Sequence, residues 1–440
     1  MRDLLLVGII LGALPFALRH TWVAVMLWTW ISIMNPHRLA FGFASTLPVA
    51  AVAAGAALLS LVFTRDKLRM PWSPPVIVLV LFVVWMCLTT AFAINPLGSW
   101  DQLNKVLKIQ LMTAVALMAL HERKHIELFI WVNVLSVGYY SFKGGLFTIT
   151  TGGEYRVWGP EDSFFWDNNA LAVATIMVIP MMYYLRVVST HRWVRFGLLM
   201  LMLLSAVSAL GSQSRGALLA ITAMGSVFWY RSNRKGLVGI VVVAVAIGLI
   251  SFMPDSWSNR MATITTYEED NSAKDRLIAW QFCFNLANHR LSGGGYEIYN
   301  ALTYTLYAPE TWRNAFAAHS IYFSVLGEHG YVGLVLFLLI WGLTFRLAGK
   351  LRRETRGQPG VAWVFHLTGM FQVSLVGYLA GGAFLSLAYF DLPYNIMVIL
   401  VVTQRWLRES GWKPAAVGAL GSASAGKPSD LPVKASRAPV

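Results

Sequence analysis

Long apolar segments fill most of the chain and are separated by short polar stretches. Many of them approach the roughly 20 residues that an α-helix needs to cross the hydrocarbon core of a bilayer. Two shorter runs, 4–18 and 21–34, form either two tilted crossings or one broken re-entrant pair. The pattern predicts an all-α polytopic integral membrane protein with about 12 transmembrane helices, or 13 if both short runs cross. The longer expected spans are residues 45–64, 75–94, 106–120, 126–147, 170–188, 193–210, 216–230, 237–252, 321–348, 362–387 and 394–406.

One long polar stretch, residues 254–319, interrupts this pattern. We expect it to form a large loop containing short helices. The loop separates an N-terminal transmembrane bundle, residues 1–253, from C-terminal transmembrane helices within 320–412. The tail, residues 413–440, is rich in Ala, Gly, Ser, Pro and Lys, which is typical of a disordered segment.

The basic residues predict an orientation in the membrane. Charged residues make up only 13% of the chain, against roughly 25% in soluble domains, yet the net charge is +14. Lys and Arg concentrate in short loops at alternate span ends, as the positive-inside rule describes, so a nucleic-acid partner is not expected. These loops then face the cytoplasm and the large loop faces the opposite side, which in a bacterium is the periplasm. The basic clusters occupy residues 65–69, 123–124, 192–195, 231–235 and 350–356.

Several arginines do not follow this bias, and three of them, at the outer end of a span or in the large loop, are the candidates for binding: Arg215, Arg276 and Arg290. A guanidinium group donates two parallel hydrogen bonds to phosphate oxygens, so these arginines are candidates for binding a diphosphate. The helix that begins after Arg215 would add free N–H groups and the positive end of a dipole. Two other interpretations stay open: Arg215 as an interfacial anchor, and Arg276 as the partner of a nearby acid such as Asp275.

His319 lies where the large loop re-enters the membrane. A neutral imidazole can accept a proton from a hydroxyl near pH 7, so His319 is a candidate general base. It could instead be an interfacial residue before a helix capped by Ser320. No Cys or carboxylate pair completes a metal-ligand set around it, and no metal site is expected. The nearby Gly293 and Gly295 either form a tight turn or allow close backbone approach to a lipid-linked phosphate or sugar.

Three segments resemble the O-antigen ligase superfamily, which includes O-antigen ligases, O-antigen polymerases and protein O-oligosaccharyltransferases. Residues 212–217, Ser-Gln-Ser-Arg-Gly-Ala, are similar to the family's Ser-Arg-Gly start of a span. Arg276, Trp280 and the glycines at 293–295 resemble its R-x-x-x-W and G-x-G stretch. His319-Ser-Ile-Tyr with the glycines of 327–333 resembles its H-N and G-x-x-G helix.

The likeness extends to the N-terminal half and has two departures. Residues 35–39 and 153–169 resemble the subgroup of O-glycosylation ligases, and the whole is most similar to bacterial lipopolysaccharide O-antigen ligases. The family often has proline before its glycine pair, where this chain has His289-Arg290, and asparagine where this chain has Ser320. Neither departure removes a group assigned to the transfer chemistry.

The resemblance implies transfer of a glycan from undecaprenyl diphosphate to a sugar hydroxyl of lipid A-core, at the periplasmic face. Arg215 and Arg276, with Arg290 as a weaker third candidate, would bind the donor diphosphate, His319 would be the base, and Gly293 and Gly295 would form a turn near the donor. Arginines in place of a metal predict a metal-independent, inverting enzyme without a cofactor.

Two kinds of alternative remain. A polymerase or a protein O-oligosaccharyltransferase would use the same donor with another acceptor. A lipid or solute transporter would need ionisable residues along a path through the membrane, and Glu328 and His329 are the main residues of that kind inside a span.

Overall fold

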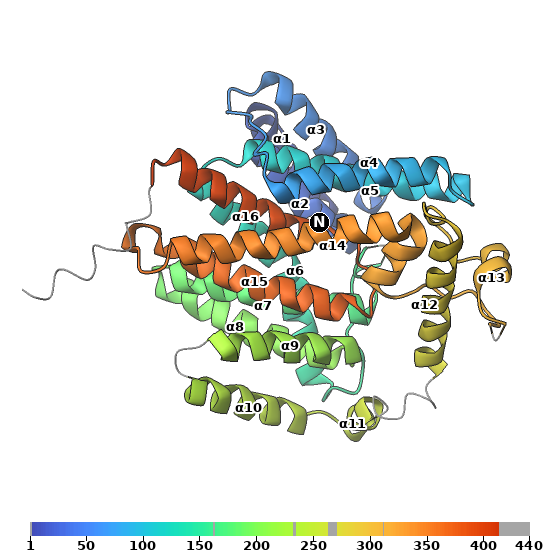
Figure 1. Cartoon of the computed structure of the whole chain (residues 1–440). Coiled ribbons are helices and arrows are strands. Elements are labelled where there is room, and N and C mark those ends of the chain that lie inside the picture. Colours follow the sequence, from blue (N-terminus) through green and yellow to red (C-terminus); the bar gives the residue numbers. More distant parts are fainter. Residues whose placement is uncertain (1, 162, 232–234, 263–270, 311, 413–440) are drawn as a thin grey trace, which may run out of the picture.

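The computed structural model describes residues 2–161, 163–231, 235–262, 271–310 and 312–412, and this part of the chain is helical and contains no β-strand. The expected tail, 413–440, lies outside the described residues. Short 3-10 turns occupy η1 Pro36–Leu39, η2 Phe43–Ser45 and η4 Pro359–Val361. The α-helices, drawn in Figure 1, are α1 Arg2–Arg19, α2 Thr21–Met34, α3 Val49–Phe63, α4 Pro74–Ala91, α5 Pro96–Ala119, α6 Arg123–Thr150, α7 Asn168–Val188, α8 Arg192–Gly211, α9 Arg215–Arg231, α10 Lys235–Ser251, α11 Asp255–Ala262, α12 Asn271–His289, α13 Ala301–Tyr307, α14 Ile321–Glu354, α15 Ala362–Gly382 and α16 Asp391–Glu409.

Several of these helices have the length and composition of membrane spans. Five are long and apolar enough to cross a bilayer: α4, α7, α8, α14 and the segment Pro359–Gly382 that contains α15. The helices α2 and α3 are apolar but shorter. The all-helical class with several candidate membrane spans is therefore confirmed, whereas the expected number of about 12 crossings stays a prediction.

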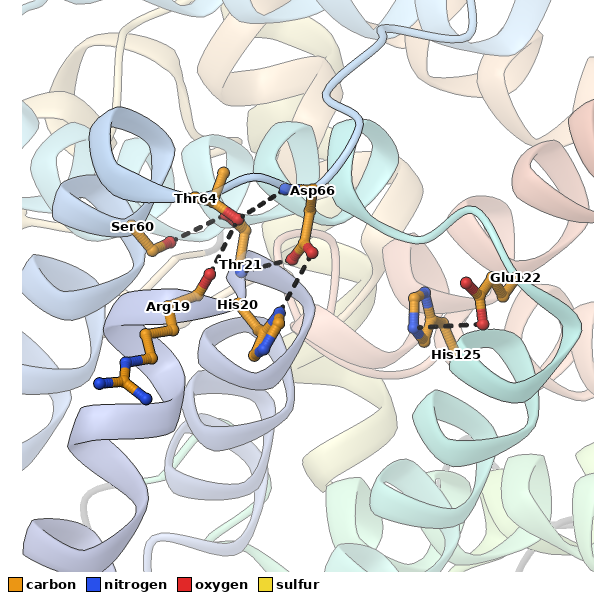
Figure 2. Close-up of polar contacts among 8 residues, drawn as sticks. All are labelled: Arg19, His20, Thr21, Ser60, Thr64, Asp66, Glu122 and His125. Atoms are coloured by element: carbon orange, nitrogen blue, oxygen red, sulfur yellow. Dashed lines mark hydrogen bonds and ion pairs between the residues drawn. The ribbon is translucent and has the colours of Figure 1, made fainter.

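The first two apolar runs form two separate helices that meet at a sharp corner, shown in Figure 2. Asp66, just after α3, accepts a hydrogen bond from the backbone N–H of Thr21 at 3.1 Å and lies 3.1 Å from Nδ1 of His20. Thr64 donates to the carbonyl of Arg19 at 3.1 Å. A carboxylate at the first N–H groups of α2 supplies the cap that His20 does not provide. The chain thus turns back between the two short runs.

The centre of the bundle is built from α7, α15 and α16, which bury most of their residues. Large aromatic side chains fill the space between α14, α15 and α16. The indole of Trp341 lies 5.2 Å from the rings of both Tyr378 and Tyr394, and all three side chains are fully buried. Close packing of this kind holds helices together where lipid gives little hydrophobic driving force.

One predicted span begins too late. The apolar run at 106–120 is only the second half of α5, which begins at Pro96. Proline fits the first turn of a helix because its missing N–H would have no partner there, and the Asn95 side chain accepts a weak hydrogen bond from the N–H of Gly98 at 3.4 Å. The polar first turns therefore follow helix-start signals and not hydrophobicity.

The expected loop, residues 254–319, contains the helices α11, α12 and α13. Figure 1 shows α12 and α13 gathered at one end of the bundle, beside the start of α14. The first turns of α7 and α9 lie at the same end. The last turns of α4 and α15 also lie there, because α4 and α15 run antiparallel to α7 and α9. The side of the membrane that this end faces stays a prediction.

Candidate active site

His319 lies between the loop and the first residue of α14, and its backbone is in the left-handed region with φ 43°. Ser320 caps α14 by accepting a hydrogen bond from the N–H of Phe323 at 3.5 Å, as expected from its position before an apolar run. The neighbours Ala318 and Ser320 are buried, whereas the His319 side chain is exposed. This backbone turns the imidazole out just before the first turn of α14, where a substrate can reach it.

Arg276 is held near His319 by the tryptophan four residues further along α12. Nε1 of Trp280 donates to the carbonyl of Ala318 at 2.8 Å, and its indole stacks on Phe323 with 4.8 Å between ring centroids. Residues four apart share one face of a helix, so Arg276 lies on the face that Trp280 attaches to α14. The R-x-x-x-W spacing thereby has a physical reason.

Arg215 begins α9 after a tight loop. The loop carbonyl of Ser212 accepts a hydrogen bond from the Asn168 side chain at 2.7 Å, and Gln213 has a positive φ of 55°. Ser214 caps α9 by accepting from the N–H of Ala217 at 3.2 Å. Arg215 is half-buried and interacts with other residues. The Ser-Gln-Ser-Arg segment thus fixes the first turn of α9 against the first turn of α7.

Two contacts of Phe384 connect the elements that carry Arg215 and Arg276. A Cβ placed on Gly216 would lie 3.5 Å from the Cβ of Phe384, just after α15. The ring of Phe384 lies 6.1 Å from the indole of Trp280. The start of α9, the end of α15 and the middle of α12 are therefore neighbours.

Asp167 and Asn168 were not singled out as site residues from the sequence. Asp167 caps α7 by accepting from the N–H groups of Asn169 and Ala170 at 2.8 and 3.2 Å. An acidic residue directly before an apolar run is a recognisable cap signal, but its link to the Arg215 loop through Asn168 is non-local. The Asn168 bond joins the N-terminal ends of α7 and α9. Together with the N-terminal end of α14, these positive helix ends lie at the same end of the bundle.

The electrostatic surroundings of His319 favour its neutral form. Partial burial by the surrounding protein, followed by the positive charge of Arg276, lowers the pKa of His319 below its usual 6.5, and the carboxylate of Asp167 opposes this effect. The imidazole is accessible, but neighbouring groups still remove part of its hydration. A neutral imidazole at neutral pH is the form that accepts a proton.

Arg290 and the glycine turn have structural contacts. The Arg290 guanidinium donates to the carbonyls of Gly293 at 3.1 Å and Phe92 at 2.6 Å, which fastens the turn to the end of α4. These two bonds use two of the five guanidinium N–H donors, so Arg290 has a structural role, and its binding role stays a prediction.

The glycines at 293–295 approach another backbone closely. The N–H groups of Gly294 and Gly295 donate to the carbonyls of Gly327 and Glu328, each at 2.9 Å. These carbonyls precede Gly330, whose φ of 65° and ψ of −168° break α14. A Cβ on Gly293 would lie 2.7 Å from the Glu328 carbonyl oxygen, so close packing against α14 requires glycine here, and the position of the turn near the donor stays a prediction.

Replacing Gly330 by alanine should lower the melting temperature of the purified protein in detergent. A Cβ there would lie 2.0 Å from the carbonyl oxygen of Leu291, and the positive φ adds strain, which together cost roughly 2 kcal/mol or more. Gly342 lies in the same helix with open space around it, so Gly342→Ala is the matched control and should not lower the melting temperature. Equal melting temperatures for the two variants would contradict this account of the break.

The ionisable residues in the first turns of α14, Glu328 and His329, have partners inside the protein. The hydroxyl of Tyr389 donates to Oε2 of Glu328 at 2.6 Å, and Nδ1 of His329 lies 2.7 Å from the Thr89 hydroxyl. Both residues are buried beside the glycine turn. This arrangement explains their presence in a span by local hydrogen bonding and does not require a transport path.

The geometry defines a multi-pass membrane protein in which two arginines and an accessible histidine lie at one end of a helix bundle. Comparison with family models identifies the class more closely. Residues 200–338, which contain Arg215, Arg276 and His319, match the model described as O-Antigen ligase. This match supports the O-antigen ligase superfamily, whose members are membrane glycosyltransferases.

The remaining comparisons add one further match. Residues 1–190 match a family of unknown function, DUF5935. A search of curated proteins found no match for the chain.

Proposed function

We propose that this protein transfers O-antigen polysaccharide from undecaprenyl diphosphate to a sugar hydroxyl of lipid A-core. One observation supports this assignment most. His319 lies close enough to Arg276 for that charge to lower its pKa, and both lie at the end of the bundle where the N-termini of α7, α9 and α14 are found. Convergent helix N-termini and guanidinium groups are suited to an anionic leaving group. The accessible imidazole is suited to a hydroxyl acceptor.

In the proposed reaction, the acceptor oxygen attacks the anomeric carbon of the donor sugar as His319 takes the hydroxyl proton. The bond from that carbon to the diphosphate oxygen breaks, and the electron pair leaves with the diphosphate. Arg215 and Arg276 stabilise the negative charge that develops there, and His319 later releases its proton to water. A single displacement of this kind inverts the anomeric carbon. The diphosphate is a good leaving group, so no general acid is required.

The proposed site faces the periplasm. Arg231 and the cations at 350–356 lie at the opposite ends of α9 and α14 from Arg215 and His319. By the positive-inside rule that end belongs to the cytoplasm, which leaves the site on the other side, where assembled lipid-linked glycans are presented.

The purified full chain, given a labelled undecaprenyl-diphosphate glycan, should transfer the label to lipid A-core in the presence of EDTA. Parallel reactions would contain a serine-bearing protein acceptor or a second lipid-linked glycan instead. Label on either of these alone would make the protein an O-oligosaccharyltransferase or a polymerase. Loss of transfer in EDTA with recovery in Mg²⁺ would overturn the metal-independent mechanism.

A further inference from the structure

A cavity of about 1280 Å³ lies at the end of the bundle that carries the basic clusters. From His319 the helix α14 runs roughly 45 Å to this end, at 1.5 Å per residue. The cavity is bordered by the first turn of α4, the last turns of α9, α14 and α16 and the first turn of α15. Six arginines line it: Arg231, Arg346, Arg352, Arg353, Arg356 and Arg408.

The positive charge in this cavity is largely uncompensated. No Asp or Glu is among the lining residues in the part of the chain that the structure describes. Lys350 also lines the cavity and pairs with Glu354 at 3.9 Å, which offsets one cation. Burial, and then the charge of Arg352, lower the pKa of Arg231, so two guanidinium groups are close enough to repel each other.

Arg231 has a donor without a partner. Its Nη1 is buried and makes no hydrogen bond to any residue within the described ranges. A buried guanidinium nitrogen without an acceptor is costly, and an anionic oxygen in the cavity would satisfy it. Repulsion between Arg231 and Arg352 would decrease with the same ligand.

The lining is apolar as well as cationic. The guanidinium of Arg231 lies 5.9 Å from the ring centroid of Phe345, and that of Arg352 lies 5.0 Å from that of Phe365. These rings position the two cations without neutralising them. Pro74 and Leu343 extend the apolar part of the lining. A ligand with phosphate groups attached to a hydrocarbon chain matches both parts.

The positive-inside rule explains why cations occupy this end, but not why six from three helices and an adjoining turn converge on one cavity. Arg192 and Arg195 obey the same rule at the start of α8 and are not among the lining residues. They therefore provide a matched control for general attraction to anionic lipids.

We propose that this cavity binds the headgroup of an anionic phospholipid that carries two phosphate groups. Basic pockets between membrane helices on the cytoplasmic side bind such headgroups. A soluble diphosphate offers the same phosphate chemistry without the hydrocarbon chain, and the apolar lining favours the lipid. The proposal concerns a different end of the bundle from the transfer site and does not depend on the proposed function.

The test is a titration of the delipidated full chain with cardiolipin, with bound lipid counted by native mass spectrometry. The wild type should bind cardiolipin at lower concentration than phosphatidylcholine. The double variant R231Q/R352Q should weaken this binding about tenfold or more, a loss of about 1.4 kcal/mol or more, because it removes two cations that would pair with the phosphates. The control R192Q/R195Q, with the same change in charge, should bind as the wild type does.

Equal weakening in both double variants, or no preference for cardiolipin over phosphatidylcholine, would overturn the proposal. Inorganic pyrophosphate is the competitor that separates the two sources of phosphate. If it displaces cardiolipin at equal concentration, the hydrocarbon chain contributes nothing and the lipid assignment is wrong. If R231Q/R352Q does not fold, Arg408→Gln on α16 applies the same test, and unchanged binding in that variant would contradict the site.

Discussion

Replacing His319 by alanine is expected to reduce glycan transfer by about 100-fold or more, the usual contribution of a positioned general base. The side chain is exposed at the start of α14, so its removal leaves no buried cavity and should not change the melting temperature. The measurement is the initial rate of label transfer from the lipid-linked donor to lipid A-core, made beside a thermal unfolding curve of the same preparation.

His289 provides the matched control, because it is an exposed histidine in the same loop region, at the end of α12. Its Nδ1 lies 2.8 Å from the carbonyl of Asn285, which is a local helix-end contact. His289→Ala should retain transfer close to the wild-type rate. A His319→Ala protein that inserts, folds and transfers at a normal rate would remove the proposed base from the mechanism.

Replacing Arg276 by glutamine is expected to slow transfer and also to move the acid limb of its pH profile to higher pH. Arg276 lowers the pKa of His319, so loss of its charge raises that pKa. The base is active when neutral, and transfer falls as pH decreases through the pKa of His319. With a higher pKa this fall begins at a higher pH. The measurement is kcat/KM for the donor across pH 5 to 9 (about the range in which histidine titrates).

Arg276→Lys separates charge from geometry. Lysine keeps the positive charge near His319, so the acid limb should stay at the wild-type position. Lysine lacks the planar fork that binds phosphate oxygens in pairs, so the rate on the alkaline plateau should still fall. An unchanged acid limb in Arg276→Gln, with a rate loss equal to that of Arg276→Lys, would show that Arg276 acts on the donor alone.

The sequence predicted the class of the fold because a bilayer imposes a strong and local constraint. Runs of apolar residues identify helices such as α7 and α8 to within two residues at each end. It failed at α5, whose first turns are polar and depend on Pro96 and Asn95 instead of hydrophobicity. It also left the first two runs undecided, because the corner at His20 depends on Asp66, a residue distant in the chain.

The candidate site was predictable only in part. The interfacial positions of Arg215, Arg276 and His319 follow from their places at span ends and in the polar loop. The function of the glycines could not be read from composition, since a close approach to a ligand and a close approach to α14 demand the same residue. Asp167 was missed because its effect on His319 acts across the bundle, between residues far apart in the sequence.

The break at Gly330 changes where a chimaera between two such enzymes should be joined. Residues 321–329 are separated from the rest of α14 by the break, while Gly294 and Gly295 hydrogen-bond to the carbonyls of Gly327 and Glu328. The first turns of α14 therefore form one structural unit with the preceding loop. An exchange that ends at His319 would cut through this unit, whereas one that ends after Gly330 would transplant it whole.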